Sequence, residues 1–81
     1  MEADIMTQEH VIALAMVAVR NATPKDAQVF NFSIDFLKEA PDTLVPDVKV
    51  LHHGRKTLVL DVEIKDLDET LIAKALVTML L

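Results

Sequence analysis

The sequence predicts a small α+β domain with the element order α-β-β-β-α, in which two helices pack on one face of a three-stranded antiparallel sheet. Three observations support this prediction: an unbroken apolar run over residues 11–19, an apolar–polar alternation over residues 28–37, and a similar alternation on both sides of Gly54. With 81 residues, of which 52% are hydrophobic and 26% charged, residues 1–81 are expected to form a single folded domain.

The first predicted helix covers residues 5–20. Thr7 or Asp4 can serve as its N-cap, and Arg20 stands near its end, where the helix dipole favours a positive charge. A buried strand is the alternative for so short an apolar run, but the alanine, leucine and methionine content favours a helix. Because the run has no polar face, we expect this helix to be covered on more than one side.

Residues 28–37 are predicted to form a strand. Large apolar residues alternate with polar ones in this segment: Phe30, Phe32, Ile34 and Phe36 against Asn31, Ser33 and Asp35. Such a period of two is typical of a strand with one buried face. A helix is the alternative, but its apolar stripe would leave Phe32 and Phe36 on the opposite side.

Residues 48–50 and 58–64 are predicted to form a β-hairpin with one face in water. If the apolar residues of both strands share a face, the residue numbers of two directly paired positions must add up to an even number. The loop between the strands must then have an odd number of residues. The predicted loop is His52-His53-Gly54, in which Gly54 supplies the left-handed conformation that a three-residue loop needs.

Residues 67–81 are predicted to form the second helix. Asp66, followed three residues later by Glu69, has the spacing of a capping box. The helical period selects an inward stripe made of Leu67, Leu71, Ile72, Ala75, Leu76, Met79 and Leu80. A solvated end would favour charged residues, so we expect this apolar end to be docked.

Composition and motifs exclude several classes of function. The absence of cysteine removes disulfides and thiolate chemistry, and a net charge of −5 disfavours generic binding to nucleic acid or anionic lipid. No apolar run approaches the roughly 20 residues of a membrane span, and the acidic start does not resemble a secretory signal, so the chain is predicted to be cytoplasmic. Without a catalytic triad or a glycine-rich loop, we expect no enzyme activity, cofactor, metal ion or small-molecule substrate.

The leading hypothesis is therefore a non-enzymatic protein that binds other proteins, as an assembly factor, chaperone or inhibitor. A domain of this size leaves apolar surface exposed, and a second copy of the chain is the simplest partner to cover it. The predicted oligomer interface consists of Ile12, Met16, Val19, Val77, Leu80 and Leu81.

A basic hairpin tip provides the alternative hypothesis. His52, His53, Arg55 and Lys56 gather positive and titratable groups in an otherwise acidic chain, so the tip is predicted to bind a partner. A module associated with nucleic acid, contacting phosphate through this tip, is the alternative function. Solvated charge that protects a sheet edge from aggregation also explains such a tip. The adjacent histidines lack the spacing of a metal site.

Overall fold

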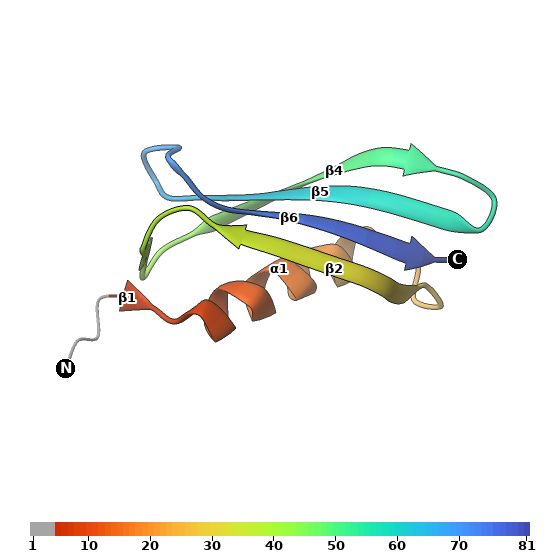
Figure 1. Ribbon diagram of the computed structural model, residues 1–81, viewed down its shortest axis with the longest axis horizontal. Helices are drawn as coiled ribbons and strands as arrows, with labels where there is room; N and C mark the ends of the chain where they lie inside the picture. Colours follow the sequence, from red (N-terminus) through yellow and green to blue (C-terminus); the bar gives the residue numbers. More distant parts are fainter. Residues whose placement is uncertain (1–4) are drawn as a thin grey trace.

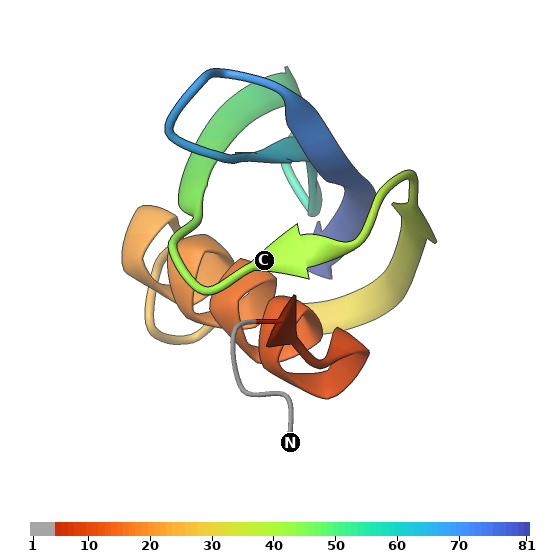
Figure 2. The ribbon, with the colours of Figure 1, turned by 90° about the vertical axis from the view of Figure 1, so that its left-hand side faces the viewer.

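A curved antiparallel sheet wraps around one α-helix in the computed structural model, which describes residues 5–81 (Figures 1 and 2). The elements are β1 (Ile5–Met6), α1 (Gln8–Ala22), β2 (Gln28–Phe36), β3 (Ala40–Pro41), β4 (Val45–His53), β5 (Thr57–Lys65) and β6 (Leu71–Leu80). The large sheet has the order β2-β6-β5-β4, and β1 pairs with β3 in a separate two-stranded sheet. The α+β class is confirmed, but the sheet has four strands instead of three.

Helix α1 packs on one face of the sheet, which we call the inner face. Val11, Ala15 and Val19, spaced four residues apart, are buried and form the contacting stripe. The rest of the apolar run is only partly covered, and Val17 on the far side is 56% exposed. The expectation that the helix is covered on several sides is therefore wrong for this chain alone.

The inner face of the sheet supplies the other half of the core. Its buried members alternate along the two central strands: Leu58, Leu60, Val62 and Ile64 in β5, and Ala73, Ala75, Val77 and Met79 in β6. Each of these residues pairs directly with a buried residue of the other strand, so the two rows form one continuous apolar surface.

The predicted strand over residues 28–37 is confirmed as β2. It lies at one edge of the sheet, paired only with β6 among the described elements. Half-buried Phe32, Ile34 and Phe36 face inward, and Ser33 and Asp35 between them are exposed, as the period of two requires.

The prediction of a second helix is wrong, because residues 71–80 form strand β6 in the middle of the sheet. Burial alternates there with a period of two, so Leu76 and Leu80 of the predicted helical stripe are exposed on the face opposite to α1, which we call the outer face. Hydrogen bonding to strands on both sides outweighs the helix preference of the alanine and leucine residues.

The predicted capping box is a turn instead. Asp66 Oδ1 accepts hydrogen bonds from the backbone N–H groups of Asp68 and Thr70, each at 2.9 Å, in the manner of an Asx turn. Glu69 adopts a left-handed φ of 66°. The side-chain acceptor and the left-handed residue together reverse the chain between β5 and β6.

The predicted hairpin is confirmed as β4 and β5, with a different turn. Val48 pairs with Val62 and Val50 with Leu60, as the even sum requires, but the register then shifts between Val50 and His52. Because of this extra residue in β4, the chain reverses direction at Arg55 and Lys56. The turn is closed by a 2.8 Å hydrogen bond from Gly54 N–H to the Thr57 carbonyl. Gly54 has no positive φ, so the predicted left-handed loop is wrong.

Two adjacent residues at the end of β6 provide a test of the strand assignment. Met79→Ala should lower the free energy of unfolding by about 2–5 kcal/mol, because the side chain is fully buried. Leu80→Ala should change it by less than about 1 kcal/mol when unfolding is measured in dilute solution, because Leu80 lies on the outer face. Equal losses at both positions would instead fit the helical stripe.

Candidate functional site

A cleft of about 490 Å³ opens at the first turn of α1, where the helix approaches the segment that follows β2. Its walls come from two parts of the chain: Thr7, Gln8 and Val11 on the helix side, and Phe36, Leu37, Lys38, Glu39 and Ala40 on the other. Figure 2 views the molecule from this end, with the start of α1 beside the β1–β3 pair.

Backbone pairing between segments distant in the sequence holds the two walls of the cleft in place. The β1–β3 pair places Met6 opposite Ala40, which fixes the residue before the N-cap beside the segment after β2. On the other wall, the N–H groups of Leu37 and Lys38 both donate to the Ile72 carbonyl, at 2.8 and 3.2 Å. Backbone hydrogen bonds therefore fix the position of both walls of the cleft.

The helix start gives the cleft a positive electrostatic character. The N-cap is Thr7, which is one of the two predicted alternatives. The other alternative, Asp4, lies outside the described residues. The Thr7 hydroxyl accepts from His10 N–H at 3.3 Å, and its carbonyl accepts from Val11 N–H at 3.1 Å. The amides of the first helical turn and the helix dipole favour a negative oxygen atom at this position.

Titratable groups at the cleft are few. Glu39 is the one carboxylate among the lining residues, and Glu9 and His10 belong to the adjoining first helical turn. From Val11 to Val19, α1 carries no ionisable side chain. Among residues 5–81, no group of three histidine, cysteine or acidic side chains could hold a metal ion. The chemistry available is a carboxylate base beside a polar helix start, next to the apolar side chains of Val11 and Phe36.

The structure brings the predicted tip residues together at the other end of the sheet. His52, His53, Arg55 and Lys56 are all exposed around the β4–β5 turn. An added Cβ at Gly54 would lie 3.0 Å from His52 Nε2, so the exposed His52 side chain would have to shift slightly. Leu81 N–H donates to the Lys56 carbonyl at 2.9 Å, so the end of β6 also lies at this turn.

The predicted oligomer interface is divided by the structure. Val19 and Val77 are fully buried in the core, so their side chains cannot contact a partner without unfolding. Ile12 and Met16 are half-buried on one flank of α1. Leu80 and Leu81, each 42% exposed, remain available. Ile12, Met16, Leu80 and Leu81 are the members of the predicted interface that reach the surface, and the interface itself stays a prediction.

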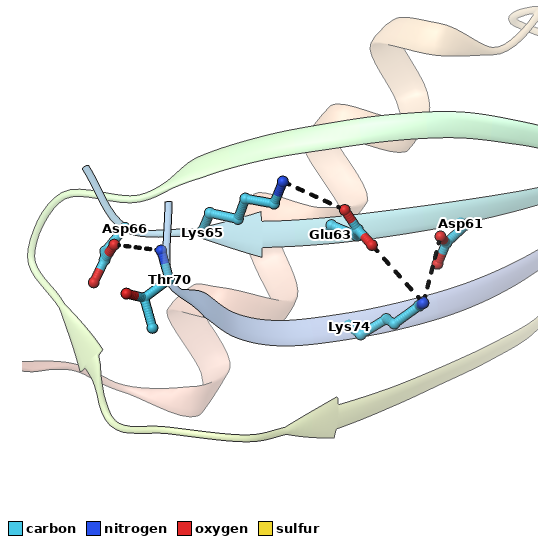
Figure 3. Close-up of polar contacts among 6 residues, drawn as sticks. All are labelled: Asp61, Glu63, Lys65, Asp66, Thr70 and Lys74. Atoms are coloured by element: carbon cyan, nitrogen blue, oxygen red, sulfur yellow. Dashed lines mark hydrogen bonds and ion pairs between the residues drawn. The ribbon is translucent and has the colours of Figure 1, made fainter. Parts of the chain in front are cut away.

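A second polar cluster lies on the outer face of the sheet (Figure 3). The Lys74 ammonium lies 3.7 Å from Asp61 and 3.8 Å from Glu63, and Lys65 lies 3.6 Å from Glu63. Asp61 is only 8% exposed. Asp61 and Glu63 thus lie on the outer face paired with lysines, and Asp61 is buried there.

Comparison with known proteins identifies the fold family. Residues 10–80 match the family model of the acyl-CoA thioesterase N-terminal domain. The chain belongs to this thioesterase family. No curated protein sequence matches it.

Three solved structures share the fold. A Streptococcus mutans protein, solved bound to acetyl-CoA, is 30% identical with a TM-score of 0.81, over 95% of this chain and 66% of that one. The Escherichia coli PaaI protein from the phenylacetic acid degradation operon is 27% identical, with a TM-score of 0.85. That match covers 95% of this chain and 59% of the PaaI chain. A hypothetical thioesterase of Streptococcus pneumoniae, solved with coenzyme A, has a TM-score of 0.86 at 24% identity. The match covers 95% of this chain and 66% of that protein.

These comparisons define the fold and its extent. The architecture is hotdog-like, with an antiparallel sheet curved around one central helix. This thioesterase-family chain spans about 59–66% of the length of those three proteins.

The predicted function is corrected by the family. A non-enzymatic assembly factor, chaperone or inhibitor, and a module associated with nucleic acid, are both overturned by membership in a thioesterase family. The expected absence of a small-molecule substrate is overturned by relatives solved with acetyl-CoA or coenzyme A. Within residues 5–81, no helix has the length and apolarity required to cross a membrane.

Sequence reasoning missed the cleft because no local motif marks it. Triads, metal spacings and glycine-rich loops are recognised by residue type and spacing, whereas the cleft combines a helix start with a segment about thirty residues further along the chain. The one local signal was Thr7 as an N-cap, which marks a helix start but gives no information about what faces it.

Thr7→Ala provides a test of the helix start in this thioesterase-family chain. Loss of the hydroxyl acceptor should lower the free energy of unfolding by about 1 kcal/mol, and Thr7→Ser should retain most of the stability. Urea unfolding followed by circular dichroism measures both variants. An unchanged midpoint for Thr7→Ala would show that the cap contributes nothing to the helix.

Proposed function

We propose that the chain binds and hydrolyses acyl-CoA thioesters. The observation that carries the proposal is the family match over residues 10–80, together with a 30% identical relative solved bound to acetyl-CoA. In the proposed reaction, water adds to the thioester carbonyl carbon, the carbon–sulfur bond breaks, and the products are a carboxylic acid and the coenzyme A thiol. The cleft at the start of α1 is the proposed site.

The helix start would stabilise the oxygen that becomes negative. As water adds, the carbonyl oxygen gains charge, and preorganised backbone N–H groups at a helix start stabilise such an oxygen more strongly than bulk water does. The His10 and Val11 amides already donate to Thr7, so the amides at the very start of the turn, at Gln8 and Glu9, would serve this role, and Gln8 lines the cleft. The side chains of Val11 and Phe36 would contact the acyl group next to the carbonyl.

Glu39 is the proposed general base. A carboxylate that removes a proton from water as it attacks the carbonyl accelerates such reactions by about 10²–10⁴-fold. Glu39 is the cleft-lining carboxylate of the described chain, and the body of α1 supplies no alternative between Val11 and Val19. The released proton would pass to the departing thiolate.

Glu39→Gln should lower kcat for acetyl-CoA hydrolysis by about 10²-fold, with little change in KM, because the amide keeps the shape but cannot accept the proton. Asp42→Asn is the matched control, since this exposed residue follows in the same connection and does not line the cleft. Release of coenzyme A thiol, followed with a chromogenic thiol reagent, measures both. Absence of any hydrolysis by the unaltered chain would overturn the proposal, and full activity of Glu39→Gln would remove Glu39 from it.

The basic tip lies at the other end of the sheet from the cleft, and the nine residues of β5 between the two ends span roughly 30 Å. Arg55 and Lys56 therefore do not line the proposed site, but as exposed cations in a chain with a net charge of −5 they would attract the phosphates of coenzyme A as it approaches. Reversing both residues to glutamate should leave the fold intact, because exposed turn positions rarely affect stability by more than about 0.5 kcal/mol.

The double reversal should raise KM for acetyl-CoA several-fold and leave kcat nearly unchanged. The KM of the unaltered chain should increase with salt, whereas that of the double variant should respond much less, because screening acts on the lost attraction. Steady-state kinetics between low and physiological salt provide the measurement. An identical salt dependence for the two proteins would show that the tip contributes nothing to binding.

A further inference from the structure

Among the described residues, Lys38 is the lysine that lines the cleft at the start of α1. It also lines a second hollow of about 510 Å³, whose other walls include Pro41, Asp66, Thr70 and Ile72. Lys38, Glu39 and Ala40 border both hollows. A ligand that extends from one hollow to the other must therefore pass these residues.

The backbone is fixed on both sides of Lys38. The N–H groups of Leu37 and Lys38 donate to the Ile72 carbonyl, and Ala40, two residues further on, pairs with Met6. A lysine side chain has a flexible four-carbon stem that ends in a compact amine. The fold therefore anchors the root of this exposed side chain at the cleft, and the stem lets the amine move across it.

An amine at this position is a second nucleophile for the same thioester. In the proposed hydrolysis, water adds to the thioester carbonyl carbon next to the helix start. A lysine amine that has lost a proton can add to the same carbon. Because the cleft would hold both groups together, their effective concentration would be far higher than in bulk solution.

We propose that bound acyl-CoA transfers its acyl group to Lys38, so that the chain modifies itself. The inference rests on the proposed function, because it requires that an acyl-CoA thioester binds in the cleft. A bond forms between Lys38 Nζ and the carbonyl carbon, and the carbon–sulfur bond breaks. One ammonium group and one thioester become one amide, one coenzyme A thiol and one released proton.

Groups already placed at the cleft serve this reaction. Glu39 can accept the proton that the Lys38 ammonium must lose before it attacks. The backbone amides at Gln8 and Glu9 would stabilise the carbonyl oxygen as it gains charge, as they would in hydrolysis. The nitrogen loses a second proton as the amide forms. One of the two protons passes to the departing thiolate and the other to water, so no further reagent is required.

Acylation would change the charge of the cleft. Among the described residues that line it, Lys38 and Glu39 are the ionisable ones, and their charges cancel. An amide at Lys38 removes the positive charge and leaves Glu39, with Glu9 in the adjoining first turn of α1. The acylated cleft would repel the phosphates of coenzyme A. Modification would therefore weaken substrate binding when acyl-CoA is abundant.

Labelling of the unaltered chain with deuterated acetyl-CoA tests the proposal. Peptide mass spectrometry measures the rate at which each lysine gains the labelled acetyl group, and deuterium distinguishes it from acetylation acquired during expression. Lys49 is the internal control, because it is also exposed but lies on β4 and does not line the cleft. Lys38 should be labelled at least about tenfold faster than Lys49. Its rate should saturate at the KM for hydrolysis, whereas the Lys49 rate should rise linearly with acetyl-CoA concentration.

Two substitutions separate the modification from its consequence. Lys38→Arg keeps the positive charge but removes the amine, so labelling at this position should disappear. Lys38→Gln has the neutral charge of the acylated residue, so it should raise KM for acetyl-CoA several-fold. Lys49→Gln removes one positive charge away from the cleft and should change KM much less. Equal KM values for Lys38→Gln and Lys49→Gln would show that acylation does not weaken binding.

The outcomes distinguish self-acylation from the proposed hydrolysis. If coenzyme A thiol is released but Lys38 is labelled no faster than Lys49, self-acylation is wrong and hydrolysis stands. If Lys38 is labelled with saturation and the thiol released only equals the acetyl groups transferred, the cleft binds acyl-CoA without hydrolysing it, and self-acylation stands. If neither saturable labelling nor thiol release occurs, both proposals are wrong.

Discussion

The contact between the α1 stripe and the inner face of the sheet determines the arrangement of the rest of the molecule. Ala15 at its centre has no exposed surface, so the helix backbone lies close to the sheet. Val11 and Val19 extend this contact one turn on either side. Because the stripe fixes the position of the helix along the sheet, it also fixes where the first turn of α1 meets the segment after β2.

The sheet separates the chain into two chemical environments. Its inner face is occupied by apolar side chains, including Phe32 and Phe36, and helix α1 packs on it. Its outer face carries the paired lysines and acids of β5 and β6 together with the exposed side chains of Leu76 and Leu80. Lys74 between Asp61 and Glu63 compensates the burial of Asp61, a charged residue that would otherwise be costly at 8% exposure. The proposed cleft draws its residues from the start of the helix and from the end of β2 with the segment that follows it, and none from these ion pairs.

The sequence distinguishes a strand from a helix only where one periodicity places all the apolar residues on one face and the other does not. In residues 28–37, a helical stripe left two phenylalanines unplaced, so the strand followed from the pattern alone. In residues 71–80, the helical spacing of Ile72, Leu76 and Leu80 was as regular as the alternation of the residues that β6 buries. The choice there depended on pairing with β2 and β5, which is tertiary information. The same is true of the cleft, since Met6 and Ala40 meet only in the folded chain.

The insertion of β6 between β2 and β5 has a consequence for how the molecule folds. Gln28 at the start of β2 pairs with Leu80 at the end of β6, so the first long strand has no partner in the large sheet until the last one is in place. The β4–β5 hairpin, by contrast, involves near neighbours and can form early. During synthesis, β2 and its phenylalanines would remain unpaired until β6 leaves the ribosome. An unpaired strand with exposed phenylalanines is the kind of segment that promotes aggregation of a nascent chain.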